Sequence, residues 1–134
     1  MIRTEITTEK IEELSERKHR RNNGAELVFF GRVRDEEEGN HISGLEYEHY
    51  TGMAEQELEK LAKETFNKFP VQEIECIHRV GFVPVGEASL RLSIFSAHRR
   101  EALDAMDWFI NKLKERVPIW KWGVTSAGEK FPSK

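Results

Sequence analysis

The residues best suited to chemistry in this sequence are basic, and most of them lie in two segments near its C-terminal end. Ser96-Ala97-His98-Arg99-Arg100 opens a predicted helix, and Val117-Pro118-Ile119-Trp120-Lys121 follows it. Backbone N–H groups make the start of a helix the positive end of its dipole, so cations there are unfavourable unless an anion binds. Lys114, near the far end of the same helix, adds another amine. The pattern predicts a site for a phosphate-bearing small molecule.

Arg32 and Arg34 supply two further cations where the apolar segment 25–33 ends. Taken singly, each basic residue is also what a solvated protein surface would show, because lysine and arginine are mostly exposed. They form one anion site only if the fold brings them together, which their spacing in the sequence does not establish.

The sequence lacks the motifs of two other common kinds of site, a nucleotide-binding loop and a metal centre. Gly81 and Gly86 have the spacing of a phosphate-binding P-loop, but Glu87-Ala88 stands where the lysine and the hydroxyl residue belong. The 5 histidines form no His-Glu-x-x-His or similar helical pair of metal ligands. We therefore expect neither a bound metal nor a resident cofactor.

Length and composition indicate a single domain spanning residues 1–134. A chain of 134 residues can bury one core, and no apolar run approaches the roughly 20 residues that cross a bilayer. The formal net charge of −3 argues against nucleic-acid binding. The segment 1–5 has no features of a secretory signal. We expect a cytoplasmic protein that binds neither nucleic acid nor a membrane.

Hydrophobic periodicity predicts an α+β domain. Thr7 or Thr8 is expected to cap a short helix, with Ile11 and Leu14 facing inward, that ends before Asn22-Asn23-Gly24. The expected elements after it are strands at 25–33, 41–50, 71–80 and 87–96, a helix at 53–69, and a last helix that runs from Ser96, as its N-cap, to Val117.

Three of these segments carry further expectations. The strand at 25–33 is apolar on both faces, which is typical of a central or doubly covered strand. The polar residues 35–40 are expected to form a solvated hairpin connection or flap. Cys76, the single cysteine, excludes an internal disulfide, and its alternation with Ile74 and His78 predicts a buried position on the inner face of a strand.

Six short motifs follow one another between about Ala25 and Lys121. They are Gly31-Arg32-Val33-Arg34, Leu45-Glu46-Tyr47-Glu48-His49-Tyr50 with Met53, Ile77-His78-Arg79-Val80-Gly81, Val85-Gly86-Glu87, Ser96-Ala97-His98-Arg99 and Val117-Pro118-Ile119-Trp120-Lys121. Together they resemble the motifs of the large subunit of molybdopterin synthase, and the ordered set is far more specific than any one of them.

The resemblance implies an α/β hammerhead-like domain with an additional antiparallel sheet, a homodimer and, with a small ubiquitin-like subunit at each end, a heterotetramer. In that family, the Gly-Gly C-terminus of the small subunit carries a thiocarboxylate. Its sulfur is transferred to cyclic pyranopterin monophosphate, and two transfers build the dithiolene of molybdopterin. The resemblance therefore implies a sulfurtransferase of molybdenum cofactor biosynthesis.

By the resemblance, Lys114 and Lys121 are the catalytic candidates. The substrate-contacting positions that it implies are Arg32, Val33, Arg34, His98, Arg99, Lys114, Lys121, Trp122 and Gly123. The chain departs from the family pattern after Lys121, where another basic residue and an acid are usual but Trp122-Gly123 follows. Residues 123–134 are expected to be a mobile tail.

Two other functions stay open at this point. A non-catalytic module that binds a phosphorylated ligand would need Arg34, His98 and Arg99 but would tolerate the loss of Lys114. A dimeric scaffold would use an apolar surface, including Trp120 and Trp122, to hold partners.

Overall fold

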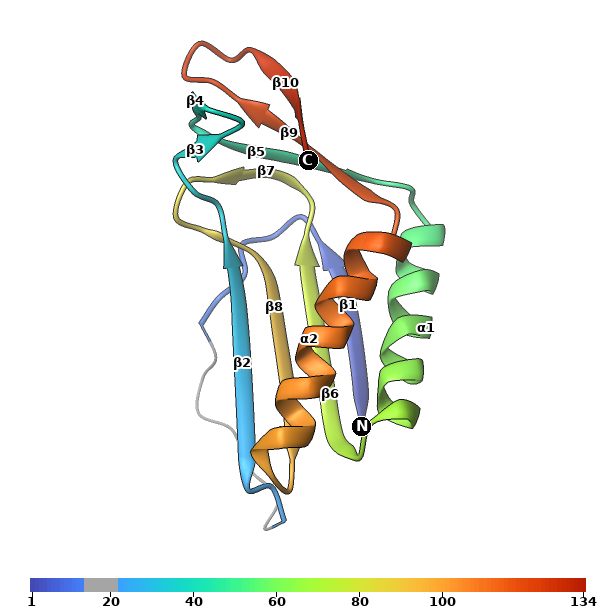
Figure 1. Cartoon of the computed structure of the whole chain (residues 1–134). Coiled ribbons are helices and arrows are strands. Elements are labelled where there is room, and N and C mark those ends of the chain that lie inside the picture. The colour runs from blue at the N-terminus through green and yellow to red at the C-terminus, as the bar shows by residue number, and fades with distance from the viewer. Residues whose placement is uncertain (14–21) are drawn as a thin grey trace.

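The computed structural model describes residues 1–13 and 22–134 and contains two main sheets, one at the end of the other (Figure 1). The larger sheet has the order β1 (Ile2–Thr7), β6 (Val71–Arg79), β8 (Ala88–Ser96) and β2 (Ala25–Arg32). The smaller sheet has the order β10 (Lys130–Ser133), β9 (Ile119–Val124), β5 (Gly44–His49) and β7 (Gly81–Pro84). A short hairpin joins β3 (Glu36–Glu37) to β4 (Asn40–His41).

Two helices, α1 (Met53–Lys68) and α2 (Arg99–Arg116), cover one face of the larger sheet (Figure 1). Each presents an apolar stripe to the sheet, as the spacing of three and four predicts. Leu58 and Leu61 of α1 and Phe109 of α2 are fully buried there. Pro70 and Pro118 follow the two helices, because proline cannot continue a helix. The predicted α+β fold and both long helices are confirmed.

The N-terminal expectation is wrong for the residues that the structure describes. Residues 2–7 form β1, which runs parallel to β6, and residues 8–13 are not helical. Thr7 does not cap a helix; its hydroxyl accepts a hydrogen bond of 3.1 Å from the Glu9 N–H. Ile11 is buried as expected, whereas Leu14 lies outside the described residues. Pairing with β6 thus outweighs the local capping signal.

Strand β2 is an edge strand of the larger sheet rather than a central one. Its two faces are nevertheless both in contact with apolar residues, since Leu27 packs against the core under the helices and Phe30 packs beside Ile11 on the other face. The apolar character of both faces therefore reflects coverage from two sides, not a position between two strands.

The start of α2 also differs from expectation. His98, not Ser96, is its N-cap residue, and Ser96 still belongs to β8. The Ser96 hydroxyl donates a hydrogen bond to the His98 carbonyl and accepts none from the N–H groups of the helix start. Helix α2 therefore begins at Arg99, with two arginines in its first turn.

The C-terminal residues 123–134, expected to be a mobile tail, contain the end of β9 and all of β10. Gly123 permits this arrangement, because a Cβ at this position would lie 2.3 Å from the ring of Phe131. Phe131 packs against a second small core formed by Val33, Ile42, Leu45 and Val83. Among the described residues, no helix has the length and apolar character that a membrane span requires.

Candidate functional site

Two of the predicted site residues, Arg34 and Lys121, meet at a carboxylate of the β3–β4 hairpin, Glu37. The Arg34 guanidinium donates a hydrogen bond of 3.1 Å to Glu37 Oε1, and Lys121 Nζ lies 3.9 Å from Glu37 Oε2. The Ser133 hydroxyl also donates to Glu37 Oε2. We call these four residues the Glu37 cluster. It places two cations, one of them the predicted catalytic Lys121, around one anion.

Strand pairing sets the position of Lys121 in this cluster. In the register of the smaller sheet, Lys121 lies opposite Tyr47 of β5 and opposite Ser133 of β10. Burial raises the pKa of Tyr47 and outweighs the hydrogen bond of 3.1 Å from its hydroxyl to Ser89 Oγ. Tyr47 is therefore a neutral neighbour of Lys121 at neutral pH, and Glu37 is the anionic one.

Lys114 lies in the last turn of α2, and its side chain is exposed. Helix α2 ends close to the start of β9, so Lys114 and Lys121 belong to the same end of the molecule (Figure 1). No ion pair or hydrogen bond of Lys114 is found within the described ranges 1–13 and 22–134. An exposed amine at this position can reach a bound molecule without breaking an internal contact.

His98 and Arg99 lie at the other end of α2 (Figure 1). With Gly24, Ala97 and Arg100 they line a shallow hollow at the helix N-terminus. Gly24 permits the close approach of the chain there, because a Cβ would lie 2.2 Å from the Ala97 carbonyl oxygen. The hollow combines positive side chains with the N–H groups of a helix start, which is the arrangement that binds anions.

These two halves of the predicted site are far apart within one chain. Arg99 and Lys114 are separated by most of α2, which at a rise of about 1.5 Å per residue corresponds to roughly 22 Å. The cations at the two ends of the helix therefore do not surround one point within a single chain. One chain alone therefore does not bring His98 and Arg99 to Lys114 and Lys121.

Arg32 and Val33 have other contacts. The Arg32 guanidinium pairs with Glu13 at 3.0 Å and donates to the Gly86 carbonyl at 3.1 Å. Val33 is buried in the small core, and its N–H donates to the Glu87 carbonyl at 3.0 Å. In this structure Val33 fixes the chain that leads to Arg34, and neither residue joins the Glu37 cluster.

Trp122 and Gly123 follow Lys121 in β9 and make different contacts. Successive side chains of a strand point to opposite faces, so Trp122 lies on the face away from Lys121, where its indole N–H donates to Glu48 Oε1 at 2.5 Å. Gly123 lies under the Phe131 ring and is buried. Both residues therefore hold β9 in place and add no functional group beside Lys121.

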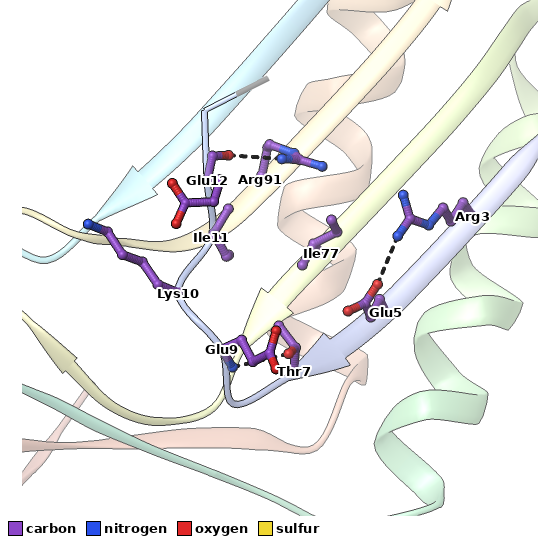
Figure 2. A pocket seen from close by; sticks show the side chains of 9 residues that line it. All are labelled: Arg3, Glu5, Thr7, Glu9, Lys10, Ile11, Glu12, Ile77 and Arg91. Atoms are coloured by element: carbon purple, nitrogen blue, oxygen red, sulfur yellow. Dashed lines mark hydrogen bonds and ion pairs between the residues drawn. The ribbon is translucent and has the colours of Figure 1, made fainter. Parts of the chain in front are cut away.

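A second hollow lies on the face of the larger sheet that the helices leave open (Figure 2). Its two arginines already contact carboxylates, since Arg91 pairs with Glu75 at 2.9 Å and Arg3 pairs with Glu75 at 2.8 Å and with Glu5 at 3.0 Å. None of the predicted site residues lines this hollow. We therefore do not assign the anion site to it.

Cys76 is fully buried in the main core, as its alternation predicted. Burial raises the pKa of its thiol, which disfavours the thiolate. Glu37, in contrast, was not singled out by the sequence, where it is one of several acids in an apparent loop. No signal within a single sequence distinguishes it, since its burial depends on Arg34, Lys121 and the C-terminal strand.

Comparison with known proteins gives one consistent family. The profile of the family described as "MoaE protein" matches residues 2–116. The molybdopterin synthase catalytic subunit of Pyrococcus abyssi is 40% identical over 106 residues, which are 79% of this chain and 72% of that protein. The Bos taurus molybdopterin synthase catalytic subunit is 46% identical over 98 residues, which are 73% of this chain but only 52% of that protein.

Solved structures give the same result. A molybdopterin synthase structure from Staphylococcus aureus has a TM-score of 0.85 and 32% identity, with 96% of each chain covered. A complex of subunits 1 and 2 of the molybdopterin-converting factor from Helicobacter pylori contains a chain with a TM-score of 0.71 and 28% identity, covering 84% of this chain and 73% of that one. The fold of this chain is therefore shared by proteins of one biosynthetic activity.

Proposed function

This chain belongs to the MoaE family of molybdopterin synthase catalytic subunits, and on that basis we propose that it transfers sulfur from the C-terminal thiocarboxylate of a small ubiquitin-like subunit to cyclic pyranopterin monophosphate. The observation that supports this most directly is the placement of Lys114 and Lys121 at the same end of the molecule, with Arg34 beside Lys121. Two such transfers would complete the dithiolene of molybdopterin.

The roles of the residues follow from their chemistry. Arg34, with His98 and Arg99, would hold the cyclic phosphate through charge-assisted hydrogen bonds. Lys114 would act where the thiocarboxylate meets the pterin side chain, either as general acid and base or as acceptor of the acyl group when its bond to sulfur breaks. Lys121 would stabilise the negative charge that develops there. Cys76 is buried, so the sulfur would come from the partner.

We further propose that the protein acts as a homodimer whose pockets are shared between the two copies. The separation of roughly 22 Å along α2 supports this, because the cations at the two ends of the helix do not surround one pocket within a single chain. In a dimer with two-fold symmetry, each chain would supply His98 and Arg99 to one pocket and Lys114 and Lys121 to the other. Two small subunits would complete a heterotetramer, in keeping with the two-subunit complex from Helicobacter pylori.

The activity is tested by mixing the purified protein with a thiocarboxylated small subunit and cyclic pyranopterin monophosphate and measuring the dithiolene product. The same assay separates the alternatives. A module that only binds a phosphorylated ligand, or a scaffold, gives no product with any variant. A catalytic subunit gives product that depends on Lys114.

Sharing of the pockets is tested by mixing Lys114→Ala with Arg99→Ala at a substrate concentration too low for either variant alone to form product. If the pocket is shared, each mixed dimer contains one intact pocket, and random exchange restores about a quarter of the wild-type activity. If each pocket is built from one chain, mixing restores nothing, because every pocket then contains one of the two substitutions. The two outcomes differ without any assumption about the shape of the interface.

A further inference from the structure

Glu37 is the one buried carboxylate within a run of exposed acids. Its neighbours Glu36 and Glu38 are exposed, whereas Glu37 is only 7% exposed. An ionised carboxylate is costly to bury unless other groups compensate its charge. Glu37 is compensated by groups from three separate parts of the chain, namely Arg34, Lys121 and Ser133.

These contacts keep Glu37 charged. Burial alone raises the pKa of Glu37, but the hydrogen bonds from Ser133 and Arg34 and the charge of Lys121 outweigh it, so that the pKa lies below its ordinary value. At neutral pH the cluster therefore contains a fixed negative charge between two cations that the proposed function uses.

The partners of Glu37 are themselves held by the fold. Lys121 lies within β9, between β5 and β10, and Arg34 follows Val33, which is anchored in the small core. Ser133 lies on β10, which the contact between Phe131 and Gly123 fixes against β9. Glu37 lies in a two-residue strand of a short hairpin, and its carboxylate is the group that joins these segments.

We propose that Glu37 is a positioning residue of this site, which acts through Lys121 and Arg34 and ties both to the C-terminal strand. The inference rests on the proposed function, since it assigns Glu37 a role in the sulfur transfer that Lys121 would assist. A catalytic group that is misplaced by about 1 Å can lose a factor of roughly 100 in rate. Loss of the contact that holds the long, flexible side chain of Lys121 should therefore lower the rate of sulfur transfer measurably.

The experiment compares Glu37→Gln with Glu36→Gln. Both remove one negative charge from the same hairpin, but only the first removes it from the cluster. In sulfur transfer with the thiocarboxylated partner, we expect Glu37→Gln to lower kcat by about 10-fold or more and Glu36→Gln to leave it within about 2-fold. Thermal melts of each variant correct the rates for any loss of folded protein.

A spectroscopic signature separates positioning from a general structural effect. The side-chain ¹H–¹³Cε NMR signal of Lys121, assigned by its loss in Lys121→Arg, should shift in Glu37→Gln and stay in place in Glu36→Gln. If Glu37→Gln does not fold, Ser133→Ala disturbs the same carboxylate from the C-terminal strand and should shift the Lys121 signal with a smaller loss of kcat.

Three outcomes overturn the inference or its premise. An unmoved Lys121 signal in both Glu37→Gln and Ser133→Ala shows that Glu37 does not position this lysine. A shifted signal with unchanged kcat shows that the contact has no role in the reaction. A wild-type protein that forms no dithiolene refutes the proposed function, while the NMR signal still decides whether Glu37 holds Lys121.

Discussion

The two ends of helix α2 both carry cations, but only one end supplies them with anionic partners. At the C-terminal end, Arg116 contacts Glu64 and Glu57, and Lys112 lies 3.3 Å from Glu115. At the N-terminal end, His98, Arg99 and Arg100 form no ion pair with any residue in the described part of the chain. The helix dipole favours cations at the first end and opposes them at the second.

This difference indicates a role in stability for the C-terminal cations and a role in anion binding for the N-terminal ones. Paired cations at a favourable helix end can serve stability alone, so their presence says little about function. Cations at an unfavourable end, without an internal partner, indicate an anion from outside the described chain. Lys114 is a special case, since it lies at the favourable end but has no partner within residues 1–13 and 22–134. Substitutions at the two ends should therefore have different consequences.

The largest effect is expected at the C-terminal end, from Lys114→Ala. If Lys114 transfers a proton in the rate-limiting step or accepts the acyl group, its loss should reduce dithiolene formation by about 10² to 10⁴-fold. Because the side chain is exposed, the free energy of unfolding should change by no more than about 0.5 kcal/mol.

The control is Lys112→Ala, two residues earlier on the same helix. This lysine pairs with Glu115, and its loss should leave the rate of sulfur transfer unchanged. Comparable rates for the two variants would remove Lys114 from the mechanism and reduce the C-terminal end of α2 to a structural role.

The next effect is expected at the opposite end, from Arg99→Ala. If Arg99 meets the phosphate, affinity for cyclic pyranopterin monophosphate should fall by about one to two orders of magnitude, the equivalent of roughly 1.5 to 3 kcal/mol for a hydrogen bond to a charged group. Stability should hold or rise by about 0.3 to 1 kcal/mol, because a cation leaves the positive end of the dipole.

Arg100→Ala is the matched control for this experiment, since it removes the same charge one residue further into the helix. It should relieve the same repulsion and lower the affinity less than Arg99→Ala does, because Arg100 lines the same hollow but is not one of the predicted substrate contacts. Unchanged affinity together with lowered stability in Arg99→Ala would show that Arg99 is an ordinary structural residue and that the phosphate binds elsewhere.

A smaller effect concerns the joint between the two sheets, which keeps the C-terminal end of the site in place. His78 of β6 is buried against Tyr47 of β5, with ring centroids 5.3 Å apart. Burial lowers the pKa of His78 to about 4, whereas an unfolded chain has a value near 6.5. As the pH falls from about 6.5 toward 4, the unfolded state therefore binds a proton that the folded state does not, and stability is lost.

Urea unfolding at pH 7.5 and pH 5.0 measures this loss. Wild-type protein should lose about 2 kcal/mol more than His78→Gln over this interval. His41→Gln removes an exposed histidine and should retain the wild-type pH dependence. Equal losses in wild type and His78→Gln would show that another group governs the acid sensitivity of this joint.

What the sequence could predict also differs between regions. The helices from Met53 and Arg99 were predictable because each depends on its own apolar periodicity and on the proline that follows it. Strand β1 was missed because it depends on pairing with β6, which is distant in sequence. The basic residues could be listed from motifs, and the separation of Arg99 from Lys114 follows from the predicted helix. The burial of Glu37 is not encoded locally, because it depends on Lys121 and Ser133, which are distant in sequence.

The smallest effect on activity is expected from a substitution in the core between α2 and the larger sheet. Cys76 is fully buried there and its thiol pKa is raised, so we expect Cys76→Ala to transfer sulfur at the wild-type rate. Stability should fall by about 1 kcal/mol, as for the loss of one small buried group. Cys76→Ser should be less stable than Cys76→Ala, because it places a hydroxyl among apolar side chains, and equally active. Mass spectrometry of the protein during turnover should find no persulfide on Cys76; a persulfide there would place the core on the sulfur path and end the distinction between reactive ends and an inert centre.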